Sequence, residues 1–466
     1  MADRPPLAAA LSRLPAGEEA GLEIHELMRE LFPLCRSLTG PGVRRTLEIL
    51  AEKVPLEVTE VASGTPVLDW TVPPEWSIED AWIADADGRR LVDFRESSLH
   101  VVSYSAPVRG RFGFDEIRDR LFTLPDRPTL VPYRTSYWSE TWGFCLAHER
   151  LADLERAGEL EVVIESRLAP GHLVYGEAVV PGETPEEVLL STHICHPSLA
   201  NDNLSGIALL ATLARRVAET RPRLTHRFLF SPGTIGPVTW LARNAASLER
   251  IKHGMVVVCV GDPGPLTYKR SRRGRTVVDR AAAHVLAHRG NGASVRDFEP
   301  WGCDERQFCS PGFDLPVGCL MRTPPGEFPE NHTSADDLSF VTPAALADSL
   351  KACLEILAIL DQDRTVVNLS PYGEPQLGRR GLFRSAGGAG VRAEAGLPDE
   401  RALLWVLNLA DGRHSLLDIA ERSGMRFDVV QFAAQALEDA GLVEECDGPS
   451  PAHDGSPSAS TPEAAA

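Results

Sequence analysis

The chain has 466 residues, 43% of them hydrophobic, and carries 66 acidic against 47 basic side chains. This length predicts two or three domains with sizeable cores. The net charge of −19 repels polyanions, which argues against nucleic acid as a partner. Nine cysteines without a C-x-x-C pair, no signal-like start and no long apolar run predict a reduced, cytoplasmic protein without a membrane span.

The first 171 residues predict a tail, two helices and a β-rich segment. Residues 1–21 are rich in alanine and proline, so we expect them to be disordered. Apolar residues recur at helical spacing in His25–Cys35 and again in Val43–Lys53. From 59 to 171, short alternating runs separated by turn residues predict a β-rich domain inserted into the next one.

An aromatic segment, Tyr133 to Phe144, lies inside this β-rich region. Aromatic residues favour strands, so ordinary core packing is the first interpretation. The segment is also rich in polar groups, which leaves a second interpretation, an aromatic wall over a binding site. The side chains of that wall would be Tyr137, Trp138 and Trp142.

Residues 22–58 and 172–373 together predict an α/β domain. Apolar strand-like runs alternate there with helical stretches, the pattern of a mostly parallel sheet covered by helices. The expected strands are Glu187–Thr192, His226–Ser231, Met255–Gly261 and Leu315–Arg322.

The C-terminal part predicts a separate small module. Residues 374–396 form a Gly/Arg/Ala-rich linker, 397–446 contain three helical runs typical of a winged helix, and 447–466 form a disordered tail. Residues 397–446 contain ten acidic and four basic residues, the reverse of what phosphate contacts need. We therefore interpret the module as a packing, dimerisation or partner domain, and a homo-oligomer could form through it.

One stretch carries the first chemical signal. An apolar strand ends at His193, and after a polar loop Asp202 precedes a helical run that begins at Leu204. In open parallel sheets this edge binds ligands, and imidazole with carboxylate suits zinc. The alternative is structural, with Asp202 near a helix start as a cap and His193 hydrogen-bonded in a loop.

His193 and the run Ala200-Asn201-Asp202-Asn203-Leu204-Ser205-Gly206 resemble the metal-binding core of the M28-type zinc aminopeptidases. Four other blocks resemble a narrower group, the DUF4910 aminopeptidase-like proteins with a C-terminal winged helix: Leu99–Ser105, Trp142–Leu146, Asp304–Gly312 and His332–Leu338. The resemblance implies an aminopeptidase-like mostly parallel sheet with helices on both faces, an inserted β-rich domain and the winged helix.

The resemblance also implies metal ligands, namely His193, Asp202, Asp262 and His332. Asp262 directly follows a strand, but Pro263-Gly264 comes next, so a turn-forming role is the alternative. His196 is either a further ligand or a polar pocket group. Asp336 either steadies His332 as an outer-shell partner or caps a helix.

The position of the usual general base is altered. The wider zinc aminopeptidase family that the chain resembles carries two glutamates after the strand that here ends at Ser231. The first is a general base and the second is a metal ligand. This chain has Gly233 and Thr234 at these positions. Thr234 therefore favours one zinc ion rather than two. Candidates to replace the base are Glu305, Glu330 and Asp304, each with a structural hydrogen-bonding role as its alternative.

These observations leave two functions. The first is a zinc-dependent aminopeptidase-like hydrolase that cleaves an aminoacyl or N-acyl amide bond of a small-molecule or peptide-like substrate in a biosynthetic pathway. The second is a metal-binding pathway component that does not hydrolyse, because Gly233 replaces the expected glutamate. A transcription regulator is disfavoured by the charge of the winged helix.

Overall fold

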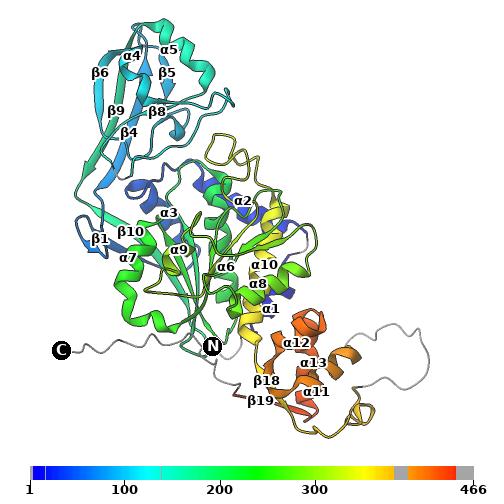
Figure 1. Cartoon of the computed structure of the whole chain (residues 1–466). Coiled ribbons are helices and arrows are strands. Elements are labelled where there is room, and N and C mark those ends of the chain that lie inside the picture. The colour runs from blue at the N-terminus through cyan, green and yellow to red at the C-terminus, as the bar shows by residue number, and fades with distance from the viewer. Residues whose placement is uncertain (1–3, 16, 138, 383–396, 448–466) are drawn as a thin grey trace, which may run out of the picture. The chain divides into compact units, whose positions relative to one another are not determined.

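The structure is a computed structural model that describes residues 4–15, 17–137, 139–382 and 397–447, in two compact units that divide after Asp361 (Figure 1). Within the described ranges, none of the helices has both the length and the apolar character needed to cross a lipid bilayer. The predicted α/β fold with an aminopeptidase-like sheet and a C-terminal winged helix is confirmed.

An eight-stranded mixed sheet organises the first unit. Its order is β1-β10-β12-β11-β13-β16-β14-β15, and the central strands β12, β11, β13 and β16 are parallel. Their carboxyl ends therefore meet at one edge of the sheet, where ligands bind in open α/β folds. The strands are β1 Leu56–Ala62, β10 His172–Val180, β11 Glu187–His193, β12 Thr225–Ser231, β13 Ile251–Val257, β14 Thr267–Lys269, β15 Ser294–Arg296 and β16 Val317–Met321.

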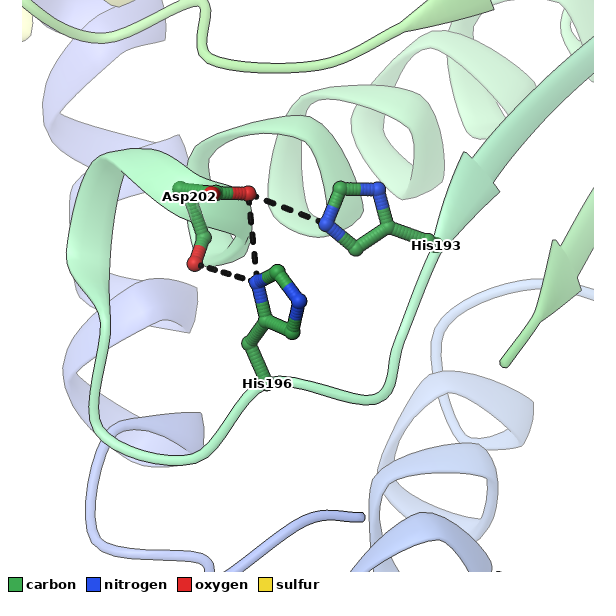
Figure 2. A group of neighbouring side chains, drawn as sticks. All are labelled: His193, His196 and Asp202. Atoms are coloured by element: carbon green, nitrogen blue, oxygen red, sulfur yellow. Dashed lines mark hydrogen bonds and ion pairs between the residues drawn. The ribbon is translucent and has the colours of Figure 1, made fainter. Parts of the chain in front are cut away.

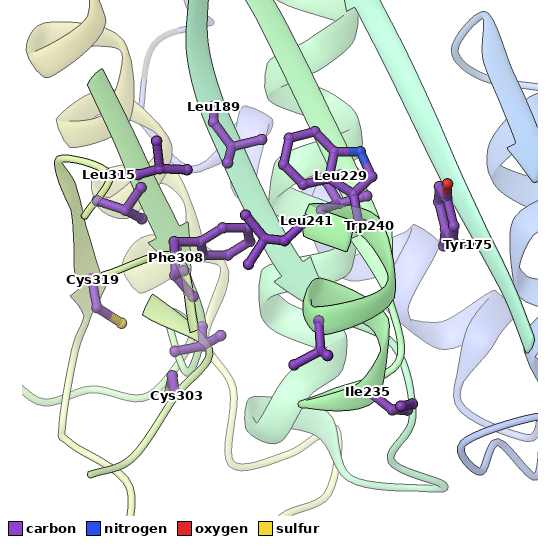
Figure 3. Close-up of a cluster of buried hydrophobic side chains, with 14 of the residues drawn as sticks. Tyr175, Leu189, Leu229, Ile235, Trp240, Leu241, Cys303, Phe308, Leu315 and Cys319 are labelled. Atoms are coloured by element: carbon purple, nitrogen blue, oxygen red, sulfur yellow. The ribbon is translucent and has the colours of Figure 1, made fainter. Parts of the chain in front are cut away.

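Helices cover both faces of this sheet. Leu189 and Leu229 pack with α7 (Ile235–Asn244) and α9 (Glu305–Phe308) in one buried cluster (Figure 3). Side chains alternate along strands, so Leu190 and Phe228 point to the other face, and they are also fully buried. Further helices of the unit are α2 Glu19–Leu31, α3 Pro41–Ala51, α6 Gly206–Ala218, α8 Val277–Ala287 and α10 Pro343–Gln362.

The N-terminal segment corrects one expectation. The sequence predicts disorder over 1–21, yet residues 4–15 contain the short helix α1 (Ala9–Ser12). Leu7 is only 1% exposed, and the Arg4 guanidinium donates to the Ala218 carbonyl at 2.7 Å. Burial of apolar side chains anchors a segment whose composition alone suggested a free tail.

The inserted domain is built on a four-stranded antiparallel sheet, β5-β4-β9-β6 (Figure 1). It has its own apolar core. It begins later than the predicted 59, because β1 belongs to the large sheet, and at its other end β10 of the large sheet begins at His172. Its elements are β4 Glu75–Ala84, β5 Arg90–Asp93, β6 Val108–Gly113, α4 Phe114–Ile117, α5 Leu151–Ala157 and β9 Glu159–Ala169, and the short pairs are β2 Pro66–Val67 with β3 Trp70–Thr71, and β7 Leu121–Phe122 with β8 Phe144–Cys145.

The second unit begins earlier than the predicted 397. Strand β17 (Thr365–Asn368) pairs antiparallel with β18 (Asp411–Ser415) and β19 (Val443–Cys446), so the α/β domain ends before 373. The paired strands lie far apart in the sequence, so local sequence patterns do not reveal the pairing. The helices are α11 Glu400–Leu409, α12 Leu416–Ser423 and α13 Phe427–Asp439. Most of the predicted linker (383–396) and of the predicted tail (448–466) lies outside the described residues.

Two histidines in the large sheet, His226 fully buried and His253 partly buried, predict a loss of stability in mild acid. His226 and His253 both lie opposite Val188, and burial lowers the pKa of each to about 4. The unfolded chain binds these protons near pH 6.5, whereas the folded chain does not until about pH 4, so stability falls as pH drops through this window. We expect about 2 kcal/mol lost per histidine between pH 7 and 5.

Urea unfolding with a chelator present, at pH 7 and pH 5, measures this loss. The variant His226→Gln removes one titrating group, so its unfolding free energy should change less between the two pH values than that of the natural chain. An equal change in both proteins would show that His226 is not the group responsible.

Candidate metal centre

The loop after β11 is fixed by the two asparagines of the Asn-Asp-Asn run. The Asn203 amide donates to the His193 carbonyl at 3.0 Å, and its oxygen accepts from the Cys259 backbone at 3.2 Å. The Asn201 oxygen accepts from the backbone N–H of Gly261 at 2.9 Å. These bonds tie the end of β11 to the segment after β13.

Helix α6 begins against the sheet because Gly206 has no side chain. A Cβ there would lie 2.5 Å from Asn203 Oδ1 and 2.6 Å from the Val257 carbonyl. The glycine therefore allows the close approach that holds the loop of Asp202 beside His193.

Three imidazoles converge on the Asp202 carboxylate. Oδ1 lies 3.0 Å from His193 Nε2 and 3.2 Å from His196 Nδ1, and Oδ2 lies 2.9 Å from His332 Nε2. Figure 2 shows His193 at the end of β11 and His196 on the following loop, both pointing toward Asp202. His193 and Asp202 are buried, whereas the His332 side chain is 47% exposed. The side chains at the base of the centre are therefore buried, and the His332 imidazole is accessible to solvent.

The electrostatics of this cluster favour a charged carboxylate. Burial acts to raise the pKa of Asp202, but the adjacent His196 and hydrogen bonds from His193, His196 and His332 hold it well below its usual range. Burial likewise acts to lower the pKa of His193, and the contact with Asp202 outweighs it, so that pKa is raised. The ionised Asp202 carboxylate therefore favours a positive charge beside it, carried either by a protonated histidine or by a metal ion.

The Asp336 carboxylate binds the backbone of the loop that carries Asp202, and not the His332 side chain. It accepts from the backbone N–H of Asn201 at 2.5 Å and of Asp202 at 2.9 Å. Burial raises the pKa of Asp336 to about 7. The contact predicted between Asp336 and His332 does not form among the described residues, and Asn331, which precedes His332, donates its amide to Asp202 Oδ2 at 3.3 Å.

Among the described residues, the tight group of possible ligand atoms comprises His193, His196 and Asp202; it leaves out His332, which contacts the other oxygen of Asp202, and it leaves out Asp262. Both oxygens of Asp262 are occupied. Oδ1 accepts from Gly264 N and Thr323 Oγ1 at 2.8 and 2.7 Å, and Oδ2 accepts from Asn201 Nδ2 and Thr323 N at 3.1 and 3.2 Å. Four hydrogen bonds fill the lone pairs that a metal ion would need. The turn-forming alternative describes Asp262 as it stands here.

The three candidates for the general base lie in different surroundings. Glu305 is fully buried and lies 2.5 Å from Lys269 Nζ, in an ion pair away from Asp202. The Glu330 carboxylate makes no hydrogen bond or ion pair within the described part of the chain, and the Glu330 backbone carbonyl closes a turn with Thr333. Asp304 lies beside Gly233, with Oδ1 accepting from the Thr234 backbone at 2.8 Å.

Tyr133 supplies the aromatic surface beside the histidines. Its ring centroid lies 5.0 Å from that of His196 and 5.1 Å from that of His332. Tyr137 stands behind it, with the two hydroxyl oxygens 2.7 Å apart. Trp142 instead packs on Phe112 in the core of the inserted domain, and Trp138 lies outside the described residues.

Sequence reasoning missed Tyr133 and Asn331. Tyr133 belongs to the aromatic segment already singled out, but nothing local shows which of its rings faces the histidines. Asn331 directly precedes His332, and its adjacency to an expected ligand was the available signal.

The donor set fits a zinc ion. Imidazole nitrogens with one carboxylate oxygen are ligands that zinc takes in proteins, most often four in number. Thr234 offers no carboxylate, and both oxygens of Asp262 accept hydrogen bonds. Another acidic and thiol group, Cys303, Glu305 and Cys319, already holds the Lys269 ammonium against its carboxylate.

The fold and the cluster together define an aminopeptidase-like α/β protein with a C-terminal winged helix. The chain belongs to the family described as a domain of unknown function, DUF4910, whose model matches residues 25–363, and a winged helix-turn-helix model matches residues 364–445. The resemblance drawn from the sequence is thereby confirmed.

Relatives agree with this assignment. A protein of Clostridium acetobutylicum, described as a polysaccharide biosynthesis protein with an aminopeptidase-like domain, is 49% identical over 420 residues, 90% of this chain and 95% of that protein. A crystal structure from the same organism, assigned as a peptidase, is 46% identical with a TM-score of 0.87, covering 92% and 97% of the two chains. A zinc aminopeptidase of Bacillus subtilis shares the fold at 14% identity and a TM-score of 0.54, covering 74% and 95%.

Proposed function

We propose that this chain is a zinc-dependent aminopeptidase-like hydrolase that cleaves an aminoacyl or N-acyl amide bond of a small substrate. One ion would be held by Asp202 with His193, His196 and His332. The observation that carries the proposal is the convergence of three imidazoles on one buried carboxylate at the carboxyl edge of the sheet. This set replaces Asp262 of the sequence-based expectation with His196.

The residues of the chain have separate roles in this proposal. Zinc, when bound, polarises a carbonyl and lowers the pKa of water. Asn331 and the backbone bonds to Asp336 orient Asp202. Because the His332 side chain is half exposed, substrate would reach the centre from the side of His332. The Tyr133 ring offers an apolar surface next to His332.

The contacts of the inserted domain favour a small substrate over a long peptide. The backbone N–H of Tyr133 donates to the His332 carbonyl at 2.8 Å, and the hydroxyls of Ser98 and Ser198 lie 2.7 Å apart. The inserted domain therefore rests against both loops that carry proposed ligands. The described role of the Clostridium relative in polysaccharide biosynthesis supports a biosynthetic substrate.

Gly233 supports a second function, a metal-binding pathway component that does not hydrolyse. In this alternative the centre is structural or binds a ligand without turnover. We also propose that the winged-helix unit, with its acidic composition, serves partner binding or self-association rather than nucleic-acid binding.

Hydrolysis by the zinc-loaded full chain tests the proposal. We expect release of amine from at least one member of a panel of aminoacyl and N-acyl amides, loss of that activity with a chelator, and its return with one equivalent of zinc. A zinc-loaded chain that cleaves nothing in the panel would favour the binding function instead.

A further inference from the structure

We propose that Asp304 is the proton-transferring carboxylate of this site and that it replaces, from a different loop, a carboxylate at position 233. This inference rests on the proposed hydrolytic function. The absence of a side chain at Gly233 then leaves room for the Asp304 carboxylate.

The geometry at Gly233 carries the proposal. A Cβ built on Gly233 would lie 3.9 Å from Asp304 Oδ2, 3.7 Å from His193 Cβ and 3.4 Å from Cys195 Sγ. A side chain at 233 would therefore begin in the space that the Asp304 carboxylate faces, beside the proposed ligand His193. Among the carboxylates considered as replacements, Glu305 is held by Lys269 and Glu330 lies in the loop before His332.

Asp304 is held rigidly in this position. Its Oδ1 accepts from the Thr234 backbone at 2.8 Å, which leaves Oδ2 toward Gly233. Lys269 anchors the flanking residues on both sides, because its ammonium donates to the carbonyls of Glu299 and Trp301 and pairs with Glu305. The side chain is 6% exposed, and burial raises the pKa of Asp304, which favours a group that can accept a proton.

The step balances without any further reactant. The Asp304 carboxylate accepts a proton from the water whose oxygen forms a bond to the amide carbon. The same proton then passes to the amide nitrogen as the carbon–nitrogen bond breaks, which gives a carboxylic acid and an amine and returns Asp304 to its starting state.

Asp304→Asn in the full chain tests this role. The asparagine oxygen still accepts from Thr234, so the fold and zinc content should persist while kcat falls ~10²–10⁴-fold with KM little changed. Asp314→Asn is the control, because Asp314 is a surface carboxylate ten residues on, paired with Arg272 and Arg273, and its loss should leave kcat as it is. Adding Gly233→Glu to Asp304→Asn should restore part of the lost kcat, which a purely structural role of Asp304 would not allow.

A second readout does not depend on turnover. In the cobalt-loaded chain, the Asp304 charge should oppose binding of azide, so Asp304→Asn should tighten azide binding ~10-fold or more, seen as a change in the visible spectrum. If the natural chain cleaves no amide, the hydrolytic function fails, and the azide measurement still decides whether Asp304 faces the ion. Unchanged azide affinity and kcat, or loss of metal from Asp304→Asn, would overturn the proposal.

Discussion

Replacing Asp202 by alanine should remove the metal from this protein. The natural chain is expected to hold about one zinc ion after dialysis, and Asp202→Ala close to none. Asp202 is the carboxylate on which all three imidazoles converge, and its removal leaves a buried histidine cluster without the charge that balances it. Loss of an outer-shell partner already costs about 10–100-fold in metal affinity, so loss of this ligand should cost more than ~10²-fold.

Elemental analysis of dialysed protein measures the zinc content directly. Asp337→Asn is a matched control, because Asp337 lies in the same region of the chain as His332 and makes a local turn with Ser339 at 2.8 Å. Full zinc in Asp202→Ala would take Asp202 out of the site. Two ions per natural chain at full occupancy would show that the chain supplies ligands beyond the cluster described here.

The parts of the centre that could be predicted are those fixed by short stretches of sequence. His193 and Asp202 are nine residues apart, joined by one strand end and one loop, so alternation and helix spacing were enough to bring them together. The order of strands and helices was predictable for the same reason, since each element shows its own period. The N-terminal segment differed because Leu7 and Ala10, two apolar residues in a weak pattern, are buried.

The parts that could not be predicted depend on contacts between distant segments. Asp262 follows a strand as a metal ligand would, but its oxygens are taken by Thr323, 61 residues further along. Asp304 reaches Thr234 across 70 residues, so its place beside Gly233 is a consequence of the folded sheet edge. Strand β17 is likewise assigned to the winged-helix unit by pairing with β18 and β19. Spacing rules carry no information about such pairs.

The contrast between His196 and Asp262 gives the sharpest test of the ligand set. We expect His196→Ala to weaken zinc binding by at least ~10²-fold, because its Nδ1 lies 3.2 Å from Asp202 Oδ1 within the buried cluster. Asp262→Asn should keep its zinc within about tenfold. Its cost should appear in stability, about 1–3 kcal/mol, because an amide cannot accept all four of the hydrogen bonds that the carboxylate receives.

Competition with a chromophoric chelator gives the zinc affinity of each variant, and urea unfolding of the metal-free proteins gives the stability. In this comparison the metal-free His196→Ala protein should unfold close to the natural chain, while Asp262→Asn should not. The reverse pattern, with zinc lost from Asp262→Asn and kept by His196→Ala, would mean that metal binding rebuilds the loop around Asp262 and releases Thr323. The site would then hold its ion with the ligand set that the sequence resemblance implied.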